Sequence, residues 1–194
     1  NKIALITGCT SGIGKALSVK FAQQGYNLIL VAKNKDKLKE LSNHLSQTFR
    51  IKSVFIAYGL EKPEAAEYVF RRVQELDLKI DVLVNNAGFN EFGSFIKTSR
   101  EKEHDMIYLH IFFVTDMMKL FLPSMVDNKQ GKILNIGSTG SYISCPYDAV
   151  YAATKSYILS VSKGINAELK GTGVTITTLC PGSTKTEFAA KAGM

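Results

Sequence analysis

Tyr151 and Lys155 are the two side chains of this sequence whose types and spacing best suit acid–base chemistry. Residues four apart lie on the same face of a helix. An ammonium about 4 Å from a phenol favours the phenolate by on the order of 4 kcal/mol at an effective dielectric near 20. That energy moves the pKa of a tyrosine from about 10 toward 7. The pair could therefore exchange a proton with a carbonyl or alcohol oxygen near neutral pH.

The spacing by itself is a weak signal, because the sequence contains it twice. Tyr58 and Lys62 are also four residues apart. Gly59 and Pro63 interrupt that stretch and argue against a regular helix, so we expect these two side chains not to share a face. The role of Tyr151 therefore depends on which other groups lie around it.

Ser138 is the residue expected to assist Tyr151 at the reacting oxygen. It ends a predicted strand, and the chain that follows is long enough to turn and enter the helix that carries Tyr151. A hydroxyl at this point can donate a hydrogen bond to a developing oxyanion. Ser141 and Ser144 follow in the same loop and are the alternatives, although they lie further from the strand end.

A glycine-rich turn, TGCTSGIG, follows the first predicted strand and contains Gly8, Gly12 and Gly14. Such a turn leaves backbone N–H groups free at the positive end of a helix dipole, where they attract phosphate. The spacing differs from the common G-x-G-x-x-G pattern, and the Gly-Lys-Ser/Thr ending of triphosphate loops is absent. Because the turn follows strand one of an alternating fold, we expect it to hold a dinucleotide; the alternative is a plain tight turn.

The end of the second predicted strand indicates which nicotinamide dinucleotide fits. An acidic residue there bonds the ribose hydroxyls of NAD, whereas a basic one accommodates the 2′-phosphate of NADP. The strand ends in LVAKNK, so Lys33 stands at this point, Lys35 and Lys37 follow, and no carboxylate is present. We therefore expect NADP rather than NAD, with Lys33 as the phosphate partner and Lys35 or Lys37 as further candidates beside it. The alternative is that Lys33 is simply solvated.

The surrounding sequence alternates short apolar runs with amphipathic stretches, which is typical of strands and helices in turn. This alternation predicts an α/β fold, a doubly wound parallel sheet of Rossmann type in a single domain, with helices on both faces. Ligands of such sheets bind beyond the carboxyl ends of the strands, where all of the features above fall. The predicted strands are residues 2–8, 27–32, 52–58, 81–88, 131–138 and 174–182, and the predicted helices are residues 12–25, 35–49, 62–76, 98–125 and 148–171.

Length and composition bound the class of protein. The 194 residues are 45% hydrophobic and 21% charged, and they suit one domain, residues 1–194. No run of about 18 uncharged apolar residues occurs, and the formal charge of +7 is spread along the chain. We therefore expect no membrane and no nucleic-acid partner. The three cysteines form no cluster with metal spacing, which predicts no metal site and a cytoplasmic location.

Taken together, these motifs resemble the short-chain dehydrogenase/reductase family. The likeness rests on TGCTSGIG, on NNAG at residues 85–88, on Ser138, on YAATK at residues 151–155 and on PGSTKT at residues 181–186, in the family's order. It implies an NAD(P)-dependent oxidoreductase that moves a hydride between the cofactor and a carbonyl or alcohol substrate. It also implies a homodimer or homotetramer, and a substrate-covering region beyond residue 194.

The resemblance assigns roles to particular residues. Ser138 and Tyr151 would bind the substrate oxygen, with Tyr151 as general acid/base, and Lys155 would bind the nicotinamide ribose. With Lys33 added from the strand-two argument, the residues expected to contact the cofactor are Gly8, Ser11, Gly12, Ile13, Gly14, Lys33, Asn86, Ala87, Gly88, Tyr151, Lys155, Pro181, Gly182, Thr184 and Thr186.

Two positions depart from the family pattern. His110 replaces an asparagine that commonly links the active-site lysine to a water chain, and Gly59 stands where an aspartate often bonds the adenine. Histidine titrates near neutral pH and can relay protons, so His110 is a catalytic candidate; a plain core or surface histidine is the alternative. The departures keep open an NADP-binding sensor or scaffold with little catalysis, and the same fold also serves isomerisation and dehydration.

Overall fold

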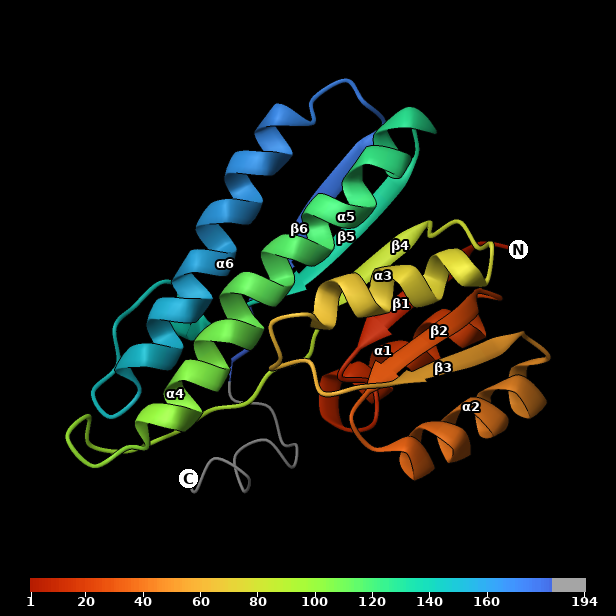
Figure 1. Cartoon of the computed structure of the whole chain (residues 1–194). Helices are drawn as coiled ribbons and strands as arrows, with labels where there is room; N and C mark the ends of the chain where they lie inside the picture. Colours follow the sequence, from red (N-terminus) through yellow and green to blue (C-terminus); the bar gives the residue numbers. More distant parts are fainter. Residues whose placement is uncertain (183–194) are drawn as a thin grey trace.

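A computed structural model of the chain describes residues 1–182 and shows one six-stranded sheet. All neighbouring strands are parallel, in the order β3-β2-β1-β4-β5-β6. This arrangement confirms the predicted doubly wound, Rossmann-type fold (Figure 1). The strands are β1 (Ile3–Thr7), β2 (Asn27–Ala32), β3 (Ser53–Ala57), β4 (Val82–Asn85), β5 (Gly131–Ile136) and β6 (Val174–Leu179).

Helices cover both faces of the sheet, because side chains alternate between the faces along each strand. Leu5 joins a core cluster with residues of α3, α5 and α6, whereas its neighbour Ile6 packs with Ala22 of α1 and Leu38 of α2. Figure 1 shows the two sets of helices on opposite sides of the sheet. The helices are α1 (Gly12–Gln23), α2 (Lys35–Phe49), α3 (Ala65–Glu75), α4 (Arg100–Ile107), α5 (Val114–Asp127) and α6 (Ala149–Glu168).

The long helix before β5 contains a feature that the sequence pattern does not predict. Between α4 and α5 the chain forms a π-helical segment, η1 (Tyr108–Phe113). A π-helical turn contains about one residue more than an α-helical turn, so it interrupts the 3.6-residue period of the apolar side chains only locally. Such segments often lie near functional sites. The π segment holds His110 in a buried position.

The same helical stretch is apolar enough to cross a membrane by length and composition. Within Arg100–Asp127, an 18-residue window has a mean hydropathy of 1.4. Met117, Met118 and Phe121 of this stretch are fully or almost fully buried in the core, whereas Phe112 is 50% exposed. One face of this apolar stretch therefore packs into the core of the domain.

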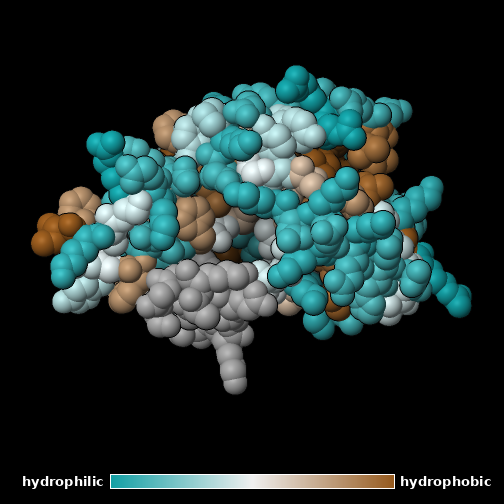
Figure 2. All heavy atoms as spheres, turned by 60° about the horizontal axis from the view of Figure 1, so that its bottom comes forward, coloured by the Kyte–Doolittle hydropathy of each residue, from teal (hydrophilic) through white to brown (hydrophobic). Residues whose placement is uncertain are grey.

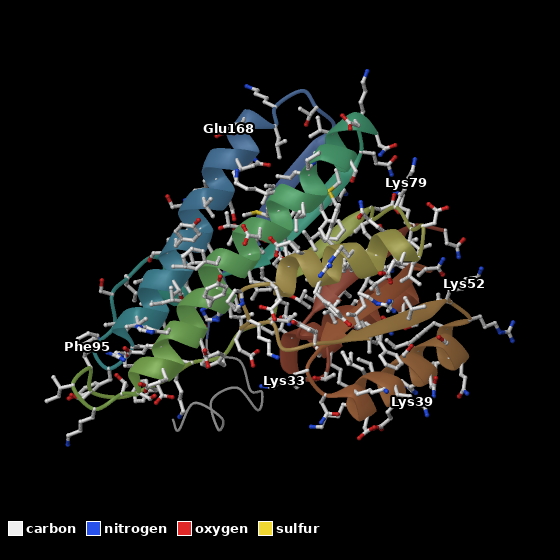
Figure 3. The ribbon with its side chains drawn as sticks, viewed as in Figure 1. Lys33, Lys39, Lys52, Lys79, Phe95 and Glu168 are labelled. Carbon is white, nitrogen blue, oxygen red and sulfur yellow. The ribbon has the colours of Figure 1, made fainter. Side chains whose placement is uncertain are left out.

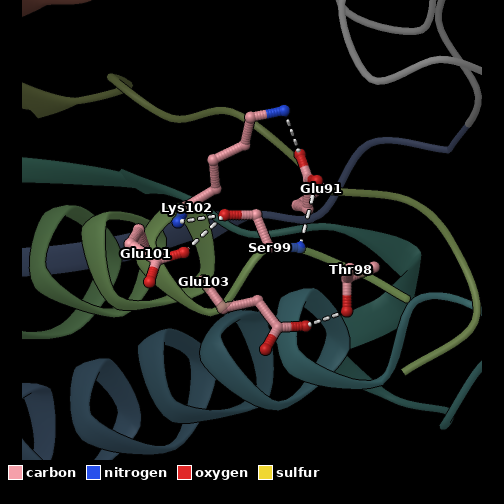
Figure 4. A network of polar contacts seen from close by, with 6 residues as sticks. All are labelled: Glu91, Thr98, Ser99, Glu101, Lys102 and Glu103. Carbon is pink, nitrogen blue, oxygen red and sulfur yellow. Dashed lines mark hydrogen bonds and ion pairs between the residues drawn. The ribbon is translucent and has the colours of Figure 1, made fainter. Parts of the chain in front are cut away.

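Polar contacts fix the start of α4 and the loop that precedes it. The hydroxyl of Ser99, the N-cap residue, accepts a hydrogen bond from the backbone of Lys102 at 3.3 Å. The ammonium of Lys102 contacts Glu91 at 3.0 Å, and Thr98 donates to Glu103 at 2.7 Å. Figure 4 shows these contacts joining Glu91 and Thr98 of the loop to the first turn of α4. The second half of the loop after β4 is thus tied to the start of α4.

Candidate active site

A cavity of about 620 Å³ lies at the carboxyl ends of the strands. The segments after β1, β2, β3, β4 and β5 line it, together with the start of α6. Its centre is the point where strand order reverses, because β1 connects to β2 on one side and neighbours β4 on the other. Open parallel sheets bind their ligands at this point. The fold therefore brings the sequence motifs to one place.

The glycine-rich turn forms the floor of one end of the cavity. Gly8 has a φ of 64° and Gly12 a φ of 52°, values that favour glycine. Ser11 is the N-cap of α1 but makes no side-chain cap hydrogen bond, and no acidic residue occupies the first turn. The first N–H groups of α1 are therefore left for a ligand at the positive end of the helix. This geometry fits a dinucleotide pyrophosphate.

Asn86 ties this turn to the end of β4. Its side-chain amide donates to the carbonyl oxygens of Thr7 at 2.9 Å and Gly8 at 3.0 Å. Gly14 does not line the cavity but packs behind the turn. A Cβ on Gly14 would lie 2.3 Å from Asn86 Nδ2 and 2.3 Å from the Gly8 oxygen. The glycine is thus required for close packing of α1 on the turn, and the cofactor contact expected of it from the sequence is indirect.

The three residues predicted to do the chemistry meet at the middle of the cavity. Ser138 follows β5, and its side chain hydrogen-bonds Tyr151 in the first turn of α6. The Lys155 ammonium lies 5.5 Å from the Tyr151 ring centroid. It is 4% exposed and donates to the Ile136 carbonyl at 3.0 Å. The cavity therefore holds a hydroxyl, a phenol and a buried cation side by side.

Burial has the largest effect on the pKa values of Tyr151 and Lys155. It raises the pKa of Tyr151, while the Ser138 hydrogen bond lowers it and the charge of Asp148 raises it further. Burial also lowers the pKa of Lys155 to about 8. In the protein alone, the pKa of Tyr151 is therefore above its ordinary value, opposite to the direction expected from the Tyr–Lys spacing. The reason is desolvation, which penalises the phenolate and which spacing does not reveal.

The other two serines of the loop lie in different surroundings from Ser138. Ser141 is buried, accepts a hydrogen bond from the Ser138 backbone and donates to the Lys155 carbonyl at 2.9 Å. Ser144 is exposed and does not line the cavity. Ser138 is the member of the three that lies against both the cavity and Tyr151.

His110 lies behind the site and does not line it. Its Nδ1 is 2.8 Å from the Thr154 hydroxyl, which itself donates to the Tyr151 carbonyl. Nδ1 must therefore carry the proton, and Nε2 has no hydrogen-bond partner among residues 1–182. Burial and the charge of Lys155 hold the pKa of His110 well below its usual range. This placement favours the alternative of a neutral core histidine over a role of His110 as a proton relay.

The second Tyr–Lys pair shows what the spacing lacks. Lys62 Nζ lies 5.4 Å from the Tyr58 ring centroid, so the two side chains do meet although no helix joins them. The expectation that they would not share a face is wrong. Lys62 is exposed, however, and the Tyr58 hydroxyl donates to Glu64 at 2.7 Å. Burial and the neighbouring serine, not cation distance, distinguish Tyr151.

Most residues predicted from the sequence line the cavity. Thr184 and Thr186 lie outside the described residues, so their predicted contacts stay predictions. The predicted residues that line the cavity are Gly8, Ser11, Gly12, Ile13, Lys33, Asn86, Ala87, Gly88, Ser138, Tyr151, Lys155, Pro181 and Gly182.

Sequence reasoning missed several polar residues of the cavity. Asn90 and Asp148 line it beside Tyr151, and the Asn90 amide donates to Asp148 at 2.7 Å. Glu61 lines the far end and contacts Lys33. These side chains come from loops with no motif. The position of Asp148 three residues before Tyr151 was the one available signal.

Figure 2 shows a hydrophilic surface over α2, and apolar side chains both at the end that carries the loops before α4 and α6 and on the opposite side of the molecule. These two loops also carry exposed apolar side chains, none of which lines the cavity. They are Phe92, Phe95, Ile96, Tyr142, Ile143 and Tyr147.

Comparison with known proteins agrees with this architecture. The profile of the family "short chain dehydrogenase" matches residues 2–193. Oxidoreductase UcpA from Escherichia coli (strain K12) is 32% identical over 189 residues, which cover 97% of this chain and 71% of UcpA. A short-chain dehydrogenase from Sphingobium yanoikuyae in complex with NADPH has a TM-score of 0.95 and 32% identity, over 100% of this chain and 75% of that one. An alcohol dehydrogenase from the archaeon Thermococcus sibiricus, complexed with 5-hydroxy-NADP, has a TM-score of 0.90 and 30% identity, over 98% of this chain and 80% of that one.

The fold and the cavity are those of a nicotinamide-dependent oxidoreductase. Because the family match extends over nearly the whole chain, this chain belongs to the short-chain dehydrogenase/reductase family. The family, the fold class and the enzyme class predicted from the sequence are confirmed. The roles of individual residues stay predictions, and they carry the proposal below.

Proposed function

We propose that this chain transfers a hydride between NADP(H) and a carbonyl or alcohol substrate, with Tyr151 as general acid/base. The observation that carries the proposal is a single cavity with a phosphate-binding turn at one end and the Ser138–Tyr151–Lys155 group in the middle. When bound, the nicotinamide would supply or accept the hydride. Tyr151 gives its proton to the carbonyl oxygen, and Ser138 donates a hydrogen bond that stabilises the developing negative charge.

Lys155 supplies the positive charge of the Ser138–Tyr151–Lys155 group. With a pKa of about 8, its buried amine is still mostly protonated at pH 7. Its hydrogen bond to the Ile136 carbonyl fixes the ammonium at the base of the cavity. From there it can bind the ribose hydroxyls of the dinucleotide and orient the reacting ring beside Tyr151.

Turnover is tested with a panel of ketones, aldehydes and alcohols, with NADPH, NADH and their oxidised forms. Oxidation or reduction of the cofactor, followed at its absorbance, supports the proposal. Tight cofactor binding with no turnover on any substrate would instead indicate a sensor or scaffold. Product formed without net cofactor change would indicate isomerisation or dehydration.

The preference for NADP rests on Lys33, which lines the cavity where β2 ends. We expect Lys33→Ala to weaken NADPH binding about tenfold, because a charge-assisted hydrogen bond contributes roughly 1.5–3 kcal/mol and this one is solvent-exposed. NADH binding should change less than about twofold. Fluorescence titration measures both. Lys52→Ala is the control, because it removes the same charge at the opposite end of the sheet (Figure 3). Equal losses for both cofactors would contradict the assignment.

Asp148 should tune the pH dependence of the reaction. The charge of Asp148 raises the pKa of Tyr151, although burial raises it more. Alcohol oxidation requires the phenolate, so its rate increases as the pH rises through that pKa. Asp148→Asn removes the charge and keeps an acceptor oxygen for Asn90. We therefore expect the midpoint of the kcat/KM profile for oxidation to move to lower pH. A midpoint that stays in place or moves upward would count against Tyr151 as the titrating group.

We also propose that the protein acts in the cytoplasm as a homodimer or homotetramer, as the family typically oligomerises. Sedimentation velocity of the purified protein tests the oligomeric state.

A further inference from the structure

Lys33 is not free at the end of β2, because it forms an ion pair with Glu61. The Lys33 Nζ lies 2.7 Å from Glu61 Oε1. Glu61 follows β3, the parallel neighbour of β2, and Ala32 is in register with Ala57 at the ends of these two strands. The sheet therefore brings to Lys33 a carboxylate that stands 28 residues away in sequence.

Both members of the pair face the cavity. Lys33 and Glu61 line it together with Ala32, Tyr58 and Leu60. The Lys33 side chain is 78% exposed, whereas that of Glu61 is 25% exposed. Of the three ion pairs within residues 1–182, this is the one whose two members both line the cavity. An ordinary surface ion pair contributes little to stability. The Lys33–Glu61 pair matters instead because it affects the binding of a charged ligand in the cavity.

A phosphate group that contacts Lys33 meets a negative charge already bound to the same ammonium. The phosphate must either displace the Glu61 carboxylate or bind beside it. Displacement breaks the 2.7 Å contact, and binding beside it places like charges close together. A ribose with a free 2′-hydroxyl meets neither obstacle, because the uncharged hydroxyl neither repels the carboxylate nor has to displace it from Lys33.

We propose that Glu61 is a specificity-determining residue, which lowers the preference for NADP over NAD by competing with the 2′-phosphate for Lys33. The inference rests on the proposed function, because it needs a dinucleotide in this cavity. It modifies the sequence interpretation, in which no carboxylate stands at the end of β2 to compete for Lys33.

The test is equilibrium binding to Glu61→Gln, which keeps the size of the side chain and removes its charge. NADPH and NADH are titrated by fluorescence, and 2′,5′-ADP and 5′-ADP by calorimetry, so that the readout does not depend on turnover. The variant should bind NADPH and 2′,5′-ADP about tenfold more tightly, which corresponds to about 1.4 kcal/mol. NADH and 5′-ADP should change less than about twofold, because they carry no 2′-phosphate.

Two further variants control the experiment. Glu168→Gln removes the same charge from an exposed carboxylate at the far end of α6 (Figure 3) and should leave all four affinities unchanged. In Lys33→Ala/Glu61→Gln, the gain for NADPH should fall below about threefold relative to Lys33→Ala, because the competition requires the ammonium.

The outcomes separate the inference from the proposed function. An unchanged ratio of NADPH to NADH affinity in Glu61→Gln would overturn the inference alone. Weaker NADH binding with unchanged NADPH binding would also overturn it, because Glu61 would then be a ribose ligand and not a competitor. A wild-type protein that binds none of the four nucleotides would overturn the proposed function and the inference together.

Discussion

Tyr151→Phe should lower kcat for ketone reduction by about 10³, within the 10² to 10⁴ range that a positioned general acid supplies. The substitution removes one oxygen and keeps the ring, which lies edge-on to His110 with centroids 5.8 Å apart. The remaining activity would come from cofactor binding and from the Ser138 hydroxyl. Steady-state kinetics with NADPH and a reactive ketone measure the loss.

Cofactor binding and folding separate this chemical effect from a structural one. NADPH affinity should fall no more than about fivefold, because a single hydrogen bond contributes about 1 kcal/mol. Tyr157→Phe is the matched control, since Tyr157 lies on the same helix and its hydroxyl contacts Thr115 at 2.8 Å, away from the cavity. Reductase activity in Tyr151→Phe within tenfold of the wild type would disprove the assigned role.

Gly14→Ala should destabilise the protein by about 3 kcal/mol, because inserting a carbon atom into a well-packed site costs about 1–3 kcal/mol. The new methyl group would overlap the Asn86 amide and the Gly8 carbonyl, each 2.3 Å from the Cβ position. Both belong to the hydrogen bond that ties the glycine turn to β4. We expect the Tm to fall by roughly 6–12 °C and NADPH binding to weaken about tenfold or more, because the turn must shift.

Gly164→Ala is the opposite case within the same chain. Gly164 lies inside α6, and a Cβ there would have no atom within 4 Å. Replacing it with alanine should stabilise the helix by roughly 0.5–1 kcal/mol. Differential scanning calorimetry of the two variants provides the comparison. A Gly14→Ala protein that melts at the wild-type temperature would show that α1 can move away from the turn at no cost.

The motifs predicted the site well because each is local. Ser11, Gly12 and Ile13 belong to one turn, and Tyr151 and Lys155 to one helix, so sequence spacing fixes their relative positions. The alternation of apolar runs predicted the parallel sheet, and a parallel sheet brings all its carboxyl ends to one edge. The sequence therefore predicts a cavity at this edge of the sheet.

Electrostatics could not be predicted in the same way. The pKa of Tyr151 depends on burial by several elements and on Asp148, and both effects oppose the one expected from Lys155. The sequence left His110 open between a proton relay and a plain core histidine; the π segment places it in the core, where desolvation lowers its pKa. A pKa reports the whole surroundings of a group, which no short motif contains.

The sequence alone determined the fold, the family and the central chemical group, because these depend on periodicity and on residues close together in the chain. Tertiary structure decided which charges meet. It paired Lys33 with Glu61 across two strand ends, brought Lys62 to Tyr58 without a helix, and placed Asn90 against Asp148. Contacts between loops depend on strand register and packing, so they become visible only when the chain is folded.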